Sequence, residues 1–305
     1  MPTRPELSVV VVVYDMAREA PRTLHSLRRD YQRGVDDLRY EVIVVDNGSP
    51  QPLAEEVVAG CGAAFRLIRI ADASPSPCAA INAAVAASSG EMVAVHIDGA
   101  RILSPGLLAL AMRAGRLHPD PVIATLGWHL GPGVQARTVG AGYSRAAEDD
   151  LLAGVGWPGD GYRLFSVSSF AGSSRAGWFR PPAESNCLFL RRDTFDRVGG
   201  YEEAFRSPGG GLANLDFFRR VVDDPATSLV VLLGEGTFHQ LHGGATTGDD
   251  GTAPAFRYRD FLPEYEAIRG ETWRAPATSF ELYGPVTEES LPFLAESLRA
   301  VDAAK

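Results

Sequence analysis

The stretch Glu91-Met-Val-Ala-Val-His-Ile-Asp-Gly-Ala-Arg101 decides the fold of this chain. Its mostly apolar residues lead to Asp98 and stop at Gly99, which predicts a short buried strand with a carboxylate at its C-terminal end. Ligands of open α/β sheets bind just beyond such strand ends. A lone aspartate there is also a common turn or cap residue, so the rest of the chain must decide between the two interpretations.

Apolar runs alternate with segments of helical periodicity before this strand. Strands are expected at 7–14, 40–45, 65–70 and 91–98, and helices at 17–33, 53–60 and 79–88. Further on, helices are expected at 105–117, 192–198, 212–222 and 288–301, and strands at 122–126, 186–190 and 229–233. The β-α-β-α-β-α-β order at the start predicts a parallel, doubly wound α/β sheet.

Residues 131–182 differ from the rest of the chain. They are rich in glycine, serine, proline and aromatic residues, and show no long helical period. A long stretch of this kind inside a compact domain predicts a binding loop or lid. Trp157 and Trp178 would suit a sugar or aromatic acceptor there, and core packing is the alternative interpretation.

Composition narrows the class of protein. The chain has 305 residues, 45% hydrophobic and 22% charged, and its net charge of −9 disfavours a nucleic-acid partner. The longest apolar run is far shorter than the ~20 residues of a membrane span, and no signal peptide is visible. Three widely spaced cysteines lack zinc-ligand spacing, which indicates reduced thiols. We therefore expect a cytoplasmic, bacterial protein; contact with a membrane surface and a homodimer stay open.

Polar residues follow three of the predicted strands, in the pairs Tyr14-Asp15 and Asp46-Asn47 and at Asp98. In a parallel sheet these strand ends meet at one edge, where they can bind a ribose, a base and a metal. Each alone could be a turn residue, but three together favour a site. The chain has no P-loop motif and no Gly-x-Gly-x-x-Gly after its first strand, which disfavours a P-loop NTPase and a standard dinucleotide-binding enzyme.

Several segments together resemble the family 2 glycosyltransferases over about residues 7–245. They are Leu7-Ser-Val-Val-Val-Val-Val-Tyr14, Glu41-Val-Ile-Val-Val-Asp-Asn-Gly-Ser49, Asn82 before Ser89-Gly-Glu91, Ile97-Asp-Gly-Ala100, and 186–205. The resemblance implies the A-type glycosyltransferase fold: a Rossmann-like mixed sheet, mostly parallel and flanked by helices, with a variable acceptor-side region. It also implies a nucleotide-diphosphate sugar as donor and a divalent metal, Mn²⁺ or Mg²⁺.

The resemblance also assigns roles. Tyr14, Asp15, Asp46, Asn47, Asn82 and Asp98 would bind the nucleotide sugar, and Asp98 with His239 or His242 would bind the metal. The alternative for the two histidines is a capped strand end. Imidazole is a reasonable ligand for Mn²⁺ and less so for Mg²⁺.

The chain departs from the family pattern at two places. Ala100 stands where a second metal-binding acid is expected, and Ala213-Asn214 stands where a Glu-Asp pair with the catalytic base is expected. Asp216 is the nearest carboxylate and is either the base or a structural acid. Asn214 has no basic group at neutral pH, so it could only orient the acceptor.

We therefore expect an enzyme, a hexosyltransferase-like, inverting, metal-dependent glycosyltransferase acting on a glycan, lipid-linked or small-molecule acceptor. Residues 1–125 would form a nucleotide-sugar-binding half, 126–250 the acceptor-binding and catalytic half, and 251–305 a C-terminal helical extension. Arginines such as Arg101 could assist the leaving diphosphate, with solvated surface as the alternative. Two other functions stay open: a non-catalytic sugar-nucleotide-binding or scaffold protein, and a nucleotidyltransferase.

Overall fold

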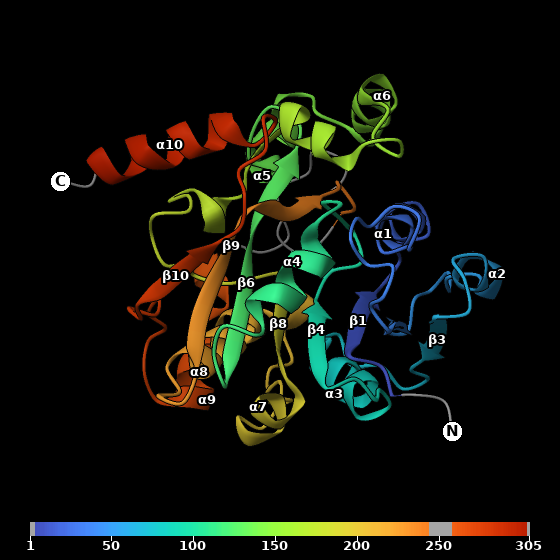
Figure 1. Ribbon diagram of the computed structural model, residues 1–305. Helices are drawn as coiled ribbons and strands as arrows, with labels where there is room; N and C mark the ends of the chain where they lie inside the picture. Colours follow the sequence, from blue (N-terminus) through green and yellow to red (C-terminus); the bar gives the residue numbers. More distant parts are fainter. Residues whose placement is uncertain (1–3, 244–257, 304–305) are drawn as a thin grey trace.

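The computed structural model describes residues 4–243 and 258–303. Within these residues one sheet of ten strands crosses the molecule in the order β10-β9-β6-β8-β4-β1-β2-β3, while β5 pairs with β9 and β7 with β6 (Figure 1). The strands are β1 Leu7–Val13, β2 Tyr40–Asp46, β3 Phe65–Arg69, β4 Met92–His96, β5 Arg101–Leu103, β6 Pro121–Leu130, β7 Ser168–Phe170, β8 Cys187–Arg191, β9 Ser228–His239 and β10 Phe280–Tyr283.

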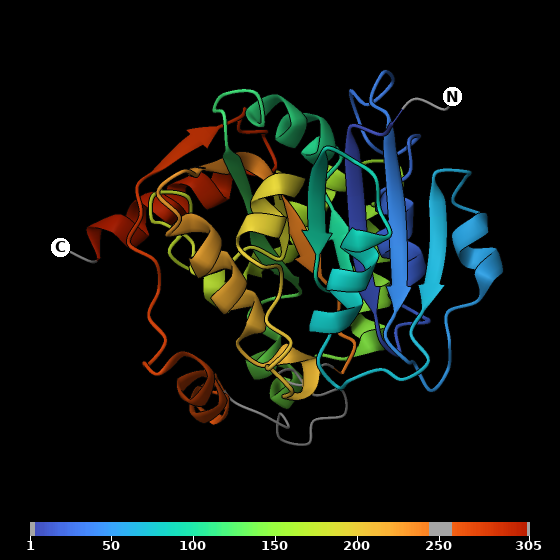
Figure 2. The same cartoon turned by 90° about the horizontal axis from the view of Figure 1, so that it is seen from below.

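Helices cover both faces of this sheet. They are α1 Ala20–Ser26, α2 Glu55–Ala59, α3 Cys78–Ala86, α4 Leu107–Ala114, α5 Gln135–Thr138, α6 Arg145–Val155, α7 Arg192–Arg197, α8 Ala213–Val222, α9 Leu262–Arg269 and α10 Leu291–Asp302. Figure 2 shows α3, α7 and α8 on the near face of the sheet. None of the helices in the described residues combines the length and hydrophobicity needed to cross a membrane.

Strand β1 shows why the centre of the sheet is so apolar. All seven of its residues are buried. Val10 and Val12 belong to a core with residues of α3, α7 and α8, whereas Val9 and Val11 belong to a second core with residues of α1, α2 and α4. Because successive side chains of a strand point to opposite faces, a strand between two layers of helices is buried along its whole length, and six of the seven residues of β1 are apolar.

The sheet is mixed, as predicted, but only slightly more parallel than antiparallel. Five of the nine pairings among the described strands are parallel, including those that join β3, β2, β1 and β4. Strand β8 inserts antiparallel between β4 and β6, with Cys187 opposite His96. Consequently the chain that enters β8 lies at the edge of the sheet where β4 ends.

The segment expected as a loop without helices is more regular than predicted. It contains α5, α6 and the short strand β7. Helix α6 begins after Ser144, whose side chain accepts a hydrogen bond from the backbone N–H of Ala147, and ends at Gly156 with φ of 59°. These are ordinary helix start and stop signals, so α6 was predictable from its caps despite its weak apolar periodicity.

The C-terminal segment is more than a helical extension. It contributes β10, which pairs in parallel with β9 at one edge of the sheet, opposite the edge formed by β3 (Figure 1). Helix α10 lies on the same side of the molecule as β10 (Figures 1 and 2). The three cysteines are free thiols, as predicted.

Candidate functional site

Asp98 lies in the turn that joins β4 to β5. One of its carboxylate oxygens, Oδ1, accepts a hydrogen bond of 2.9 Å from the backbone N–H of Ala100. The N–H of Gly99 donates to the carbonyl of Val12 at 2.6 Å. A Cβ on Gly99 would lie 2.7 Å from that carbonyl oxygen and 2.5 Å from a methyl group of Val13, so only glycine fits there. The turn therefore holds Asp98 against the end of β1.

Strand β5 brings the two predicted histidines to Asp98. It pairs antiparallel with the end of β9, so that Arg101 lies opposite His239. The Oδ2 atom of Asp98 is 3.1 Å from Nε2 of His239 and 3.7 Å from Nε2 of His242, and the two Nε2 atoms are 3.1 Å apart. One ligand atom from each of the three residues lies within 4.8 Å of the others. We call these three residues the Asp-His-His cluster.

Gln135, which the sequence analysis did not single out, holds one of these histidines. Its side-chain oxygen lies 2.6 Å from Nδ1 of His239, and its amide nitrogen donates to the carbonyl oxygen of His239 at 3.0 Å. In this arrangement Nδ1 carries the proton and donates it to Gln135. The lone pair of Nε2 then faces Asp98, as a metal ligand requires.

The charges around the Asp-His-His cluster favour an ionised Asp98 and a neutral His239. Burial works against the charged form of Asp98, but the positively charged forms that the two histidines take when protonated, together with the guanidinium of Arg101, outweigh it and hold the pKa of Asp98 well below its usual value. Burial lowers the pKa of His239 to about 4, with Arg101 acting in the same direction. Arg101 is itself buried, with its Nε 3.2 Å from Oδ2 of Asp98.

These donors fit the divalent metal that the family resemblance implies. Two imidazole nitrogens and one carboxylate oxygen converge, and the orientation of His239 is set by Gln135. Such a ligand set suits Mn²⁺ or another transition metal better than Mg²⁺, which prefers oxygen. Ala100, which stands in place of the second acid of the sequence motif, is fully buried.

The residues predicted for the nucleotide lie at the same edge of the sheet. Tyr14 is 53% exposed, and the neighbouring Asp15 has a φ of 52°, an uncommon conformation for a residue other than glycine. Asp46 is buried, and its two carboxylate oxygens accept hydrogen bonds from the backbone N–H groups of Ser49 and Leu53. Nucleotide contacts of these residues stay predictions, and Asp46 already has a structural task in fixing the turn after β2.

Two predicted amide side chains also have protein partners. The Asn47 amide donates to the carbonyl of Ser74 at 2.9 Å. Asn82, on α3, bonds both backbone polar groups of Tyr201 and the carboxylate of Glu203. Asn82 therefore ties α3 to the segment after α7, and its contact with a nucleotide stays a prediction.

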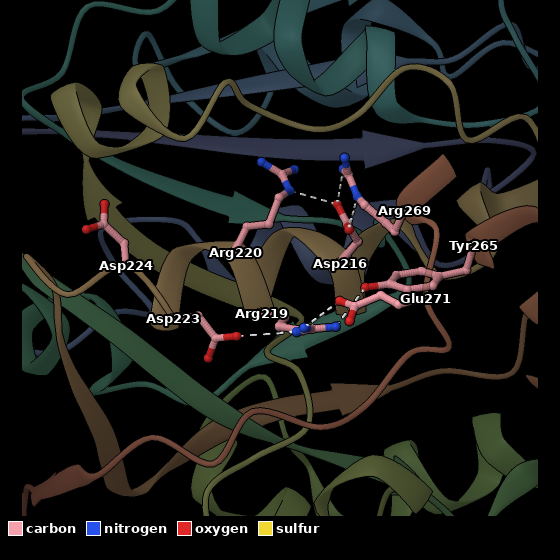
Figure 3. A pocket seen from close by; sticks show the side chains of 8 residues that line it. All are labelled: Asp216, Arg219, Arg220, Asp223, Asp224, Tyr265, Arg269 and Glu271. Atoms are coloured by element: carbon pink, nitrogen blue, oxygen red, sulfur yellow. Dashed lines mark hydrogen bonds and ion pairs between the residues drawn. The ribbon is translucent and has the colours of Figure 1, made fainter. Parts of the chain in front are cut away.

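Asp216, predicted as the base or as a structural acid, is bound to two arginines. It is 1% exposed. Arg220 donates to it at 2.8 Å, and Arg269 of α9 makes two hydrogen bonds of 2.7 and 2.8 Å (Figure 3). Both oxygens of this carboxylate thus accept charge-assisted hydrogen bonds from guanidinium groups, so neither faces an acceptor hydroxyl. Its contacts favour the structural interpretation.

Asn214, two residues earlier on α8, has different neighbours. Its amide nitrogen donates to the carboxylate of Glu184 at 2.8 Å and to the carbonyl of Ser185 at 3.3 Å, and its oxygen accepts from the hydroxyl of Tyr201 at 3.1 Å. The sequence analysis did not single out Glu184. One feature of the sequence could have pointed to Glu184. Because Asn214 stands where the family pattern expects an acid, any base would have to come from another residue.

The tryptophans expected to face an acceptor are core residues instead. Trp157 and Trp178 are 6% and 0% exposed. The Trp178 ring lies 5.7 Å from that of Trp128 and 6.1 Å from that of Phe170. An aromatic ring that is covered by other rings has no free face for a sugar, so the core-packing alternative is correct here.

Residues 8–111 match the family model described as glycosyl transferase family 2. The predicted resemblance is confirmed over these residues. A curated relative, the uncharacterized protein y4gI of Sinorhizobium fredii, is 30% identical over 217 residues, which are 66% of this chain and 21% of the relative. The chain thus spans about a fifth of the length of that relative.

Solved structures of similar fold include TarS of S. aureus. The similarity to a crystal structure of TarS covers 78% of this chain and 37% of the TarS chain, with 15% sequence identity and a TM-score of 0.51. The similarity to a TarS fragment in complex with UDP-GlcNAc covers 86% of this chain and 65% of the fragment, with 16% sequence identity and a TM-score of 0.55. The architecture and these likenesses confirm the predicted A-type glycosyltransferase fold.

Proposed function

We propose that this protein transfers a sugar from a nucleotide-diphosphate sugar to the hydroxyl group of an acceptor, with inversion and with the help of a divalent metal. The observation that carries the proposal is the Asp-His-His cluster at the end of β4, whose Asp98 lies within the segment that matches family 2. Ligands of α/β sheets bind at this kind of edge.

The class of donor follows from the fold relatives. TarS was solved with UDP and with UDP-GlcNAc, and those structures support a nucleotide-diphosphate sugar as the donor class here. Tyr14 and Asp15, beside the cluster at the end of β1, would border the base, while Asp46, Asn47 and Asn82 would shape the nucleotide side of the site.

The cluster residues would act on the leaving group. Asp98, His239 and His242 would hold the metal, and when bound it would stabilise the charge that develops on the leaving diphosphate. Arg101 would add a positive charge beside Asp98. Gln135 would keep Nε2 of His239 directed at the site.

The proposal is tested by measuring Mn²⁺ binding and donor turnover. Calorimetry with Mn²⁺ alone should detect one site, and Asp98→Asn should weaken it by at least the roughly 10–100-fold that loss of an outer-shell partner costs. His118→Gln is the matched control, because His118 pairs with Glu281 and not with the cluster. With UDP-GlcNAc and other nucleotide-diphosphate sugars, Mn²⁺-dependent release of nucleoside diphosphate is expected in the wild type and not in Asp98→Asn.

Three outcomes would contradict parts of this function. If no nucleotide-diphosphate sugar binds, the donor class is wrong. If a donor binds and turns over equally well without metal, the role of the Asp-His-His cluster is wrong. If a donor binds but neither water nor any offered acceptor reacts, the non-catalytic sugar-nucleotide-binding alternative is favoured.

A further inference from the structure

We infer that Glu184 is the base that takes the proton from the acceptor hydroxyl, and that Asn214 positions it. This inference rests on the proposed glycosyl transfer and names a residue for its second half, activation of the acceptor. Such a base must lie at the same sheet edge as Asp98 and must have a carboxylate oxygen free for the hydroxyl.

Glu184 lies at the required edge because of the antiparallel insertion of β8. Cys187 pairs with His96, and the next residues continue the pairing: the N–H of Ile97 donates to the carbonyl of Asn186 at 3.2 Å. The chain just before β8 therefore runs alongside the turn that carries Asp98. An ideal Cβ on Gly127 would lie 3.8 Å from Nδ2 of Asn186 and 3.4 Å from Nη1 of Arg101, which places the Asn186 side chain near Arg101, the residue that contacts Asp98.

The residue next to Glu184 is held in place by hydrogen bonds of its buried hydroxyl. Ser185 is buried, accepts a hydrogen bond of 3.0 Å from the N–H of Thr125 on β6, and donates to the carbonyl of Cys187 at 2.9 Å. A side chain on such a fixed segment keeps its direction, which is what a general base needs in order to meet a bound hydroxyl.

Asn214 fixes the carboxylate itself. A carboxylate can only accept hydrogen bonds, so the amide nitrogen of Asn214 must face Glu184, and the Tyr201 hydroxyl bonded to the amide oxygen agrees with this orientation. The Oε2 atom of Glu184 is bound at 2.8 Å. Within the described residues Glu184 makes no further hydrogen bond and no ion pair, so Oε1 is available to a hydroxyl.

The geometry of α8 separates Glu184 from Asp216. Residues two apart on an α-helix point about 200° from each other, so Asn214 and Asp216 face opposite sides. Asp216 meets Arg220 and Arg269, whereas Asn214 meets a carboxylate without an arginine partner among the described residues. Of the two acids, only Glu184 keeps an oxygen without a guanidinium group.

The step balances without an oxidant or a reductant. Glu184 takes the hydroxyl proton while the acceptor oxygen forms a bond to the anomeric carbon of the donor. The bond from that carbon to the diphosphate oxygen breaks, and its electron pair leaves with the nucleoside diphosphate. The proton on Glu184 is then released to solvent.

The experiment compares Glu184→Gln, Asp216→Asn and the exposed control Glu91→Gln, which lies at the opposite end of β4. The assay follows the release of nucleoside diphosphate from the donor that the wild type binds. The nucleophile is water, or an acceptor if one has been identified. Glu184→Gln should lower kcat by roughly 100-fold or more, with donor KM and Mn²⁺ affinity within about threefold of wild type. Asp216→Asn should change kcat less than Glu184→Gln once both proteins are shown to fold.

A double variant provides an independent readout. Glu184→Gln combined with Asn214→Asp returns a carboxylate to within a few ångströms of the lost one, and part of kcat should return. Asn214→Ala alone should lower kcat while donor KM stays unchanged, because Asn214 holds the carboxylate of Glu184 and does not itself contact the donor in this role.

Near-normal kcat in Glu184→Gln, in a wild type that turns over donor, would overturn this inference and leave the proposed function intact. Failure of the wild type to bind any nucleotide-diphosphate sugar would instead contradict the proposed function. A kcat loss confined to Asp216→Asn would return the base to that residue.

Discussion

At the residue scale, the candidate site depends on one carboxylate whose two oxygens have different tasks. Oδ1 of Asp98 fixes its own turn by accepting from the N–H of Ala100, while Oδ2 faces the two imidazoles. The turn bond keeps the side chain in one orientation before any ligand arrives. Such preorganisation lowers the entropy that binding would otherwise cost.

Gln135 is the residue whose effect on this site is easiest to isolate. Gln135→Met keeps the length and much of the volume of the side chain but removes the oxygen that meets Nδ1 of His239. We expect Mn²⁺ affinity to fall by roughly 10–100-fold, the usual effect of losing an outer-shell partner of a histidine ligand. Calorimetric titration measures this, with the exposed Gln51→Met as control; an unchanged affinity would show that His239 is oriented by other contacts.

At the element scale, buried polar contacts join β9 to two segments that lie far from it in sequence. Glu235 of β9 is 2% exposed and accepts hydrogen bonds from the hydroxyls of Ser104 and Tyr162 and from the N–H of Gly106, at the start of α4. A Cβ on Gly106 would lie 2.3 Å from this carboxylate, so glycine lets α4 begin there. The Glu235 side chain thus links β9 to the start of α4 and to the segment that contains Tyr162.

Glu235 predicts a pH dependence of stability. Burial raises its pKa from 4.5 to about 7, although its hydrogen bonds act in the opposite direction. The folded state therefore keeps a proton that the unfolded state has lost between these two pH values. The free energy of unfolding should fall by up to about 3 kcal/mol as the pH rises from 4.5 to 7, and stay level with respect to this group outside that window.

Glu235→Gln should remove this part of the slope. Urea unfolding of the wild type and the variant at several pH values from 4 to 8 measures the difference between their free energies of unfolding. The exposed Glu288→Gln should follow the wild type. A difference between Glu235→Gln and wild type that is constant across this range would contradict the raised pKa.

At the scale of the whole molecule, the C-terminal helix closes an aromatic core that is built from distant parts of the chain. Phe293 of α10 is 6% exposed, and its ring lies 5.5, 5.8 and 5.0 Å from the rings of Trp128, Phe165 and Phe170. The hydroxyl of Ser297, one turn later, accepts a hydrogen bond from the backbone N–H of Trp178. The C-terminal segment is therefore part of the fold that positions the site.

Phe293→Ala should destabilise the protein by about 3 kcal/mol, because it removes a ring from a packed core and leaves a cavity. Leu298→Ala is the matched control on the same helix: Leu298 is 53% exposed, and its loss should change stability by less than about 0.5 kcal/mol. Thermal or urea unfolding measures both. Equal effects of the two substitutions would show that α10 does not contribute to the core in solution.

The strands were predictable because hydrophobic periodicity is a local property. All seven residues of β1 are apolar or small, and the apolar run of β4 ends just before Asp98, so the sequence alone places a carboxylate at a strand end. The fate of Asp216 was not predictable in this way. Its partner Arg269 lies 53 residues away on another helix, and no local pattern records that contact.

The sequence by itself determined the alternation of strands and helices, the polar end of each early strand, and the segment that matches family 2, because these depend on neighbouring residues. Only the tertiary structure decided that β5 pairs with β9 and brings His239 and His242 to Asp98. It likewise decided that the antiparallel entry of β8 sets Glu184 against Asn214. Such contacts depend on strand register and helix packing, which join residues that are far apart in the chain.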